Sequence, residues 1–205
     1  MAGRGSRLRP HTLTTPKPLV PVAGKPIVEW LVRDIINLCP DKVDTIGFVI
    51  GDFGKEVEEN LIKVAESLGA KGQIFYQKEA LGTAHAIYCA NELLTGPTIV
   101  AFADTLFKTD FKINKEDDGV IFVQKVEDPS AFGVVKLSTE GIITDFVEKP
   151  ETFVSDLAII GIYYFRDGVK LRSEIKYLLD NNLKYKGEFQ LTDVMETMRK
   201  QGTQY

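Results

Sequence analysis

Glycine and basic residues at the start of the chain form a pattern typical of phosphate binding. The segment Gly3-Arg4-Gly5-Ser6-Arg7-Leu8-Arg9 is followed by Lys17 and Lys25, each next to a proline. Glycine lets backbone N–H groups approach a phosphate closely, and Arg and Lys offset its charge. The pattern favours a polyphosphate ligand, with a flexible basic N-terminus as the alternative. It matches neither the Walker A motif nor the three-glycine fingerprint of dinucleotide-binding proteins.

The stretch from Met1 to Lys25 lacks periodicity and is predicted as a loop. The elements that must position this loop alternate between strand and helix. Short apolar, β-branched runs predict strands over 45–50, 73–77 and 98–102, and apolar residues at helical spacing predict helices over 26–38, 55–68 and 83–94. This alternation predicts an α/β fold with a Rossmann-like, mixed but mostly parallel sheet flanked by helices. Ligands of such sheets gather at the C-terminal ends of the strands.

The pattern changes beyond residue 119. Strand-like runs at 120–126, 132–137, 142–148 and 157–165 follow one another, and two helical stretches at 169–180 and 191–201 complete the chain. We expect a β-rich insertion in one domain that spans residues 1–205, with halves at 1–118 and 119–205.

Composition excludes several classes of partner. With 44% hydrophobic and 26% charged residues and a formal net charge of −4, the chain has no general attraction for nucleic acid or a membrane surface. No apolar run reaches the roughly 18 residues of a membrane span. Cys39 and Cys89 lie in apolar stretches, as buried thiols of a reducing compartment do. We expect a cytoplasmic protein.

The order of motifs resembles a known family. Gly-x-Gly-Ser-Arg-Leu-Arg-Pro at 3–10, Pro-Lys-Pro-Leu-Val-Pro-Val at 16–22 and Gly-Lys-Pro-Ile at 24–27 are similar to the pattern of sugar-1-phosphate nucleotidyltransferases, the group that contains glucose-1-phosphate thymidylyltransferase. The similarity continues through Leu-Gly-Thr-Ala at 81–84, Glu-Lys-Pro at 148–150 and the segments at 187–188 and 192–193, and so covers nearly the whole chain.

This resemblance implies a role for each matching residue. Residues 1–118 would bind the nucleotide and residues 119–205 the sugar phosphate. The triphosphate would be lined by Gly3, Gly5 and Ser6, with Arg7 and Lys17 as catalytic cations. The base would contact Gln77 and Gly82, and the sugar phosphate would contact Gly133, Glu148 and Lys149. Mg²⁺ would be held by Asp104 and Asp193.

The implied chemistry requires residues of these types. An oxygen of the sugar phosphate must attack the α-phosphorus of a nucleoside triphosphate, and the two anions repel each other. Carboxylates suit Mg²⁺, which neutralises charge on both partners, while Arg and Lys act without exchanging protons. A sugar phosphate is already ionised at neutral pH, so no general base is needed, which is consistent with only two histidines.

Structural alternatives remain for the individual residues. Asp104 has the sequence context of a turn after its strand, and Glu148-Lys149 that of an exposed pair worth little energetically. Asp193 lies at the start of a predicted helix, where carboxylates favour the positive end of the dipole. Gln77 has the context of a solvated strand end.

The chain departs from the family pattern at both ends. Family members begin with an apolar strand directly before the glycine loop, whereas Met1 stands where that strand should already have ended. They also continue past the position of Tyr205 with another strand and closing helices. The resemblance therefore implies truncation at both ends, which leaves the fold assignment intact and the activity of this chain open.

The leading hypothesis is an enzyme that joins dTTP or UTP to glucose 1-phosphate and releases pyrophosphate. Three alternatives remain: a non-catalytic nucleotide- or sugar-binding regulatory module of the same fold, a cytidylyltransferase with another acceptor, and, least favoured, a dinucleotide-dependent oxidoreductase. The resemblance also leaves a homo-oligomer open.

Overall fold

The computed structural model describes residues 17–103 and 105–205, and the sequence expectations for Gly3, Gly5, Ser6, Arg7 and Asp104 lie outside them. The described residues form two compact units. The first runs to Ala80 and includes Phe102–Asn114, and the second comprises Leu81–Ala101 and Lys115–Tyr205. The single domain with halves at 1–118 and 119–205 stays a prediction. Among the described residues, no helix is long and apolar enough to cross a membrane.

The described part of the first unit begins with short elements in a stretch that the sequence predicted as loop. A 3₁₀ turn, η2 (Lys17–Leu19), precedes β1 (Pro21–Val22) and β2 (Lys25–Pro26), which pair antiparallel. Ala23 and Gly24 join them with φ of 50° and 82°. Two consecutive residues with positive φ are typical of the tight turn that closes a hairpin.

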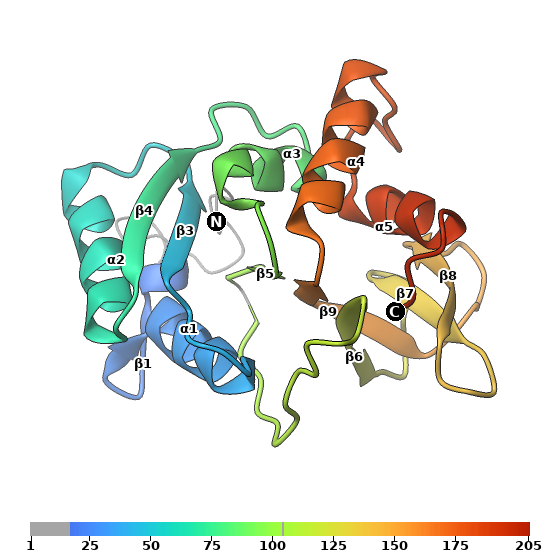
Figure 1. Cartoon of the computed structure of the whole chain (residues 1–205), viewed down its shortest axis with the longest axis horizontal. Coiled ribbons are helices and arrows are strands. Elements are labelled where there is room, and N and C mark those ends of the chain that lie inside the picture. Colours follow the sequence, from blue (N-terminus) through green and yellow to red (C-terminus); the bar gives the residue numbers. More distant parts are fainter. Residues whose placement is uncertain (1–16, 104) are drawn as a thin grey trace. The chain divides into compact units, whose positions relative to one another are not determined.

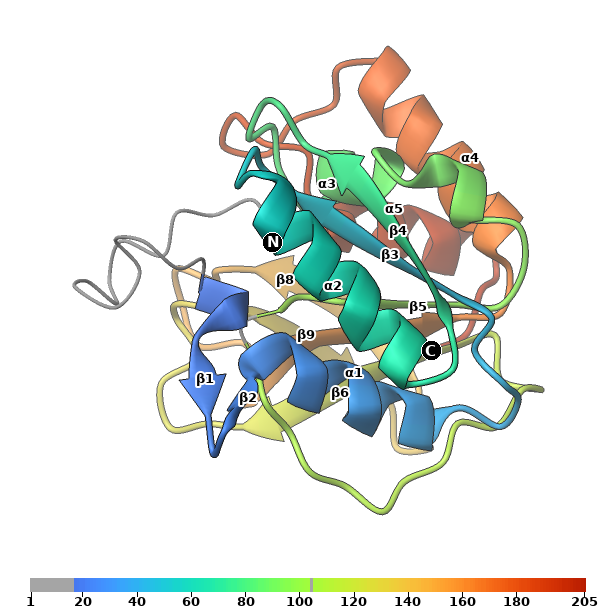
Figure 2. The same ribbon diagram turned by 90° about the vertical axis from the view of Figure 1, so that its left-hand side faces the viewer.

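The core of the first unit lies between two helices and a parallel strand pair. β3 (Thr45–Ile50) and β4 (Lys71–Tyr76) are joined by α2 (Lys55–Ser67), which lies along them in Figure 2, and α1 (Ile27–Leu38) precedes them. Its buried side chains come from α1, β3 and α2: Val28, Val32, Phe48, Ile50, Leu61 and Ala65. Apolar residues spaced three and four apart give each helix one face for this core.

The second unit is built on a five-stranded antiparallel sheet (Figure 1). Its strands are β5 (Thr98–Ala101), β6 (Gly119–Lys125), β7 (Gly133–Leu137), β8 (Ile143–Glu148) and β9 (Leu157–Phe165). The mixed α/β class predicted from the sequence is confirmed. The parallel arrangement, however, holds among the described strands only for β3–β4, because β5 pairs antiparallel with β9.

β9 organises this sheet. β6 follows one edge of β9, while β5 pairs with Ile162–Phe165 and β7 pairs with Ala158 on the other edge. The β6 register shifts where Ile121 faces Tyr163 and Val123 faces Ile159, and Gly161, with φ of 80°, lies in the resulting bulge. A bulge bends its strand. The bend separates the part of β9 that pairs with β5 from the part that pairs with β7.

Three helices complete the second unit: α3 (Thr83–Tyr88), α4 (Gly168–Asp180) and α5 (Leu191–Lys200). The helix predicted over 83–94 is shorter, because Ala90 leaves helical geometry and a 3₁₀ turn, η3 (Asn91–Leu93), replaces its end. There the Asn91 side chain donates to the Tyr88 carbonyl oxygen at 2.9 Å. The three helices contact one another, and the bounds of α4 and α5 agree with prediction to within one residue.

Candidate functional site

Among the predicted site residues that the structure describes, two lie in the first unit. Lys17 begins η2, and its carbonyl oxygen accepts from the Val20 N–H at 3.2 Å. Gln77 directly follows β4, and its backbone N–H donates to the Ile50 carbonyl oxygen at 2.8 Å. Gln77 is only 8% exposed, so the solvated strand end considered above is wrong. It lies at the C-terminal end of a parallel pair, where α/β folds place ligand-binding residues.

Gly133 and Glu148 face each other at the ends of β7 and β8. A Cβ at Gly133 would lie 3.0 Å from Glu148 Oε2 and 3.5 Å from Thr192 Cγ2. The Thr192 hydroxyl, from α5, donates to Glu148 Oε2 at 3.4 Å. A glycine at position 133 therefore leaves the Glu148 carboxylate room to meet α5.

Lys149 follows Glu148 in a left-handed conformation, with φ of 43°. Its backbone N–H donates to the Phe132 carbonyl oxygen at 3.1 Å, which holds this turn against the residue before β7. Its ammonium lies 3.9 Å from Glu148 Oε1, and its side chain is 55% exposed. A pair this long and this exposed adds little stability. The pairing is therefore no obstacle to an anionic ligand at Lys149.

Burial sets the electrostatics around Glu148. It raises the pKa of this carboxyl above its usual range, against the opposing effects of Lys149 and the Thr192 hydrogen bond, while Asp193 and Glu188 raise it further. Tyr163 is 4% exposed, and its pKa is raised by burial and by the Glu148 charge. The Glu148 carboxylate is thus both buried and close to other negative charge, and a nearby cation would favour its ionised form.

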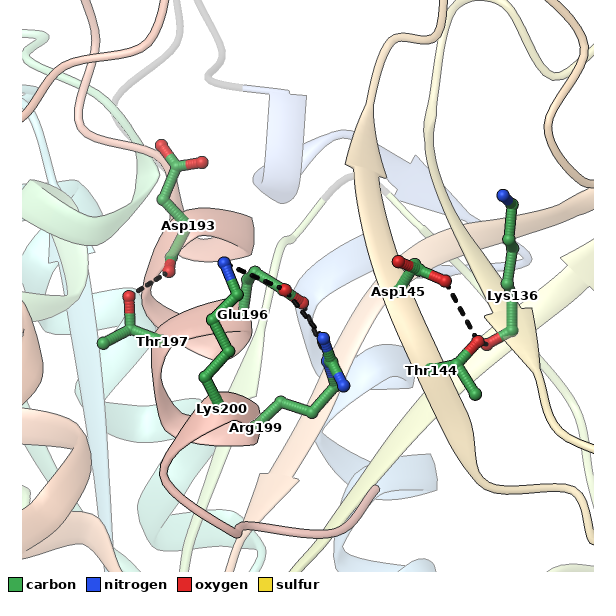
Figure 3. Close-up of polar contacts among 8 residues, drawn as sticks. All are labelled: Lys136, Thr144, Asp145, Asp193, Glu196, Thr197, Arg199 and Lys200. Atoms are coloured by element: carbon green, nitrogen blue, oxygen red, sulfur yellow. Dashed lines mark hydrogen bonds and ion pairs between the residues drawn. The ribbon is translucent and has the colours of Figure 1, made fainter.

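Asp193 is the third residue of α5 and is half-buried. Figure 3 shows its carboxylate pointing away from Glu196 and Lys200, while its carbonyl oxygen accepts from the Thr197 hydroxyl at 3.0 Å. Burial raises its pKa. Within the described part of the chain, no hydrogen bond or ion pair occupies this carboxylate.

The position of Asp193 also fits the dipole at the start of a helix, as the sequence allowed. Among residues 17–103 and 105–205, no group of three or more His, Cys, Asp and Glu could hold a metal ion. A half-buried carboxylate that has no hydrogen-bond or ion-pair partner among the described residues suits Mg²⁺ as one ligand of a larger set.

Gly82 lies at the start of α3, against a segment that precedes α5. Its φ is 118°, and a Cβ there would lie 2.4 Å from the Phe189 carbonyl oxygen and 2.6 Å from the Phe189 nitrogen. Only glycine fits such a close backbone approach. The second unit therefore contains both Gly82, predicted to contact the base, and the residues predicted to contact the sugar phosphate, on segments that are connected to one another.

Sequence reasoning missed four polar residues of this region: Thr83, Glu188, Gln190 and Thr192. Three of them lay in motifs used for the resemblance but had no assigned role, and Gln190 lay between two such motifs. Thr192 lies beside three of the predicted residues, Gly133, Glu148 and Asp193. Gly82 instead contacts Phe189, which lies two residues before α5.

Comparison with known proteins identifies the family of the chain. The family model described as nucleotidyl transferase matches residues 1–205. The low-salt glycan biosynthesis nucleotidyltransferase Agl11 of Haloferax volcanii is 33% identical over 98% of this chain and 56% of its own length. The mannose-1-phosphate guanylyltransferase catalytic subunit beta of Drosophila pseudoobscura pseudoobscura is 35% identical over 86% of this chain and 49% of its own.

A solved structure of UDP-glucose pyrophosphorylase in complex with UDP-glucose is similar to this chain, with a TM-score of 0.77 and 26% sequence identity. The match covers 98% of this chain and 84% of that one. The fold and the matched sequence define the class, and the chain belongs to the nucleotidyl transferase family of enzymes. It spans about half the length of the two curated relatives.

Proposed function

We propose that the chain is a sugar-1-phosphate nucleotidyltransferase that forms a nucleoside-diphosphate sugar and pyrophosphate. The observation that carries this proposal is that the Lys149 ammonium lies beside the Glu148 carboxylate, which meets Thr192 next to Asp193 on α5. The reaction needs such a cation and carboxylates beside the sugar phosphate. The family match supports the same reaction type.

We assign the roles of the chain's residues accordingly. Lys149 pairs with the phosphate of the sugar, and Glu148 accepts hydrogen bonds from sugar hydroxyl groups beside Gly133, where a side chain would intrude. Gln77 and Gly82 contact the base; Gly3, Gly5 and Ser6 cradle the triphosphate; Arg7 and Lys17 hold charge that develops on it.

In the reaction, a phosphate oxygen of the sugar 1-phosphate attacks the α-phosphorus. The bond from that phosphorus to the bridging oxygen of the β-phosphate breaks, and pyrophosphate leaves. Asp104 and Asp193 would hold Mg²⁺, which supplies positive charge to the attacking and leaving oxygens.

We favour dTTP or UTP as donor and glucose 1-phosphate as acceptor. The UDP-glucose complex of a similar structure supports UTP and glucose, whereas one relative is named for mannose 1-phosphate and guanylyl transfer. We also propose that the protein acts in the cytoplasm.

Pyrophosphate release tests the proposal. The purified protein is assayed with Mg²⁺, each nucleoside triphosphate and a panel of sugar 1-phosphates. Turnover should require one of each, and Lys149→Gln should lower kcat/KM for the sugar phosphate about 100-fold, as loss of a charge contact to a reacting phosphate does. The control is Lys125→Gln, which removes an exposed lysine that pairs with Asp156 at 3.1 Å and should leave turnover unchanged.

Two other outcomes would redirect the proposal. Turnover with CTP and an acceptor other than a sugar 1-phosphate indicates the cytidylyltransferase alternative. Ligand binding without turnover indicates the regulatory module.

A further inference from the structure

Two segments far apart in the sequence pair through their backbones in the second unit. The Phe189 N–H donates to the Leu81 carbonyl oxygen at 2.8 Å, and the Ala84 N–H donates to the Phe189 carbonyl oxygen at 3.0 Å. Gly82 lies between these contacts, where any Cβ would collide with the Phe189 backbone. The turn before α3 is thereby fixed to the turn before α5.

The Thr83 hydroxyl is the side-chain link between these turns. It accepts from the Leu191 backbone N–H at 2.9 Å and donates to Gln190 Oε1 at 3.2 Å. The Gln190 side-chain amide in turn donates to Glu188 Oε2 at 2.9 Å. Leu191 is the first residue of α5, and the N-cap residue Gln190 makes no capping hydrogen bond with its side chain. Thr83 therefore caps α5 from another helix.

The first residues of α5 carry the side chains that the proposed function uses. Thr192 donates to Glu148, and Asp193 points its carboxylate away from the rest of the helix (Figure 3). A shift of the start of α5 would move both. Because Gly82 packs against the Phe189 backbone just before α5, a shift of α5 would also move the turn that is proposed to contact the base.

We propose that Thr83 is a positioning residue that fixes the start of α5, and with it Asp193, against the turn that carries Gly82. Its hydroxyl thereby links the nucleotide contact to the metal and sugar phosphate contacts. The inference rests on the proposed function for its effect on turnover, but its effect on α5 is independent of any ligand.

Hydrogen exchange of the ligand-free protein tests the positioning itself. In Thr83→Val, which keeps the size and removes the hydroxyl, the Leu191 amide should exchange about tenfold faster than in the original protein. Thr83→Ser should restore its protection to within about threefold. Amides of the β6–β9 pair serve as internal control, since global destabilisation would speed their exchange as well. Unchanged exchange at Leu191 in Thr83→Val would overturn the proposal.

Kinetics then tests the link to function. Thr83→Val should raise the Mg²⁺ concentration needed for half-maximal rate and lower kcat/KM for both substrates by about tenfold or more, with rescue by Thr83→Ser. The matched control is Thr144→Val. Among the described residues, the Thr144 hydroxyl bonds only to the Lys136 carbonyl oxygen and the Asp145 carboxylate, so this variant should change neither quantity. Full activity of Thr83→Val would overturn the link. If the unsubstituted protein is inactive and Leu191 still exchanges faster in Thr83→Val, the proposed function is wrong and the positioning role is supported.

Discussion

At the scale of single residues, Gly82 is a position that tolerates no side chain. It combines a φ of 118° with a backbone contact that a Cβ would bring to 2.4 Å. The motif containing Gly82 was found in the sequence, but the reason for a glycine there was not, because Phe189 lies more than 100 residues away. A hydrogen bond such as the one from Leu191 to Thr83, across 108 positions, has no local sequence pattern.

Gly82→Ala should therefore destabilise the fold by about 3 kcal/mol or more, because strain and a backbone collision add. The matched control is Gly141→Ala, which also has a positive φ, 83°, but meets nothing within 4 Å. It should cost only about 1 kcal/mol. Urea denaturation measures both, and equal losses would show that the Phe189 contact is absent.

Glu148 gives a prediction with a defined pH dependence. Burial raises its folded-state pKa above the unfolded value, so its contribution to stability is fully present below the unfolded pKa and is lost as pH rises through the folded pKa. Glu148→Gln should therefore have a higher Tm than the original protein at neutral pH, and the difference should shrink below about pH 4. Thermal denaturation at several pH values measures this.

The comparison for Glu148→Gln is Glu140→Gln, in an exposed turn, which removes the same charge from a net-negative chain. If the Tm rises equally in both variants, the effect comes from net charge and the local explanation for Glu148 is wrong.

At the scale of elements, packing decided what the sequence could and could not predict. The strand over 45–50 was predicted with its observed bounds, because β-branched residues there are unambiguous. The antiparallel pairing of β5 with β9 was not, since a strand's partner depends on contacts across more than 50 residues. The bulge at Gly161 in β9 was not predicted either, because it depends on how β6 pairs with β9.

Tyr205 tests how the residues that follow α5 pack on the sheet. Its ring makes edge contacts with Phe146 and Phe165 at centroid distances of 5.5 and 6.3 Å, and its carbonyl oxygen accepts from the Ile143 N–H at 2.9 Å. It is 8% exposed. Tyr205→Ala should cost about 3 to 4 kcal/mol, as loss of a buried aromatic ring does. Tyr177→Ala, at a tyrosine that is 57% exposed, should cost less than about 1 kcal/mol in the same urea series; similar losses would contradict this packing.

At the scale of the whole molecule, the family assignment and the site support one reaction. The sequence-wide match and the fold establish the class, while the base, the sugar and the metal remain proposals. Glucose and UTP or dTTP cannot be read from single positions, because the named relatives of this fold use different sugars and bases.

The central claim is that a sugar phosphate oxygen attacks the α-phosphorus. The direct measurement uses a sugar 1-phosphate whose phosphate oxygens are labelled with ¹⁸O, incubated with Mg²⁺ and the nucleoside triphosphate that supports turnover, with Asp104→Asn as control. Mass spectrometry should find all of the label in the nucleoside-diphosphate sugar and none in pyrophosphate, with product strongly reduced in the control. Label in pyrophosphate, or pyrophosphate formed without a nucleotide sugar, would contradict the account.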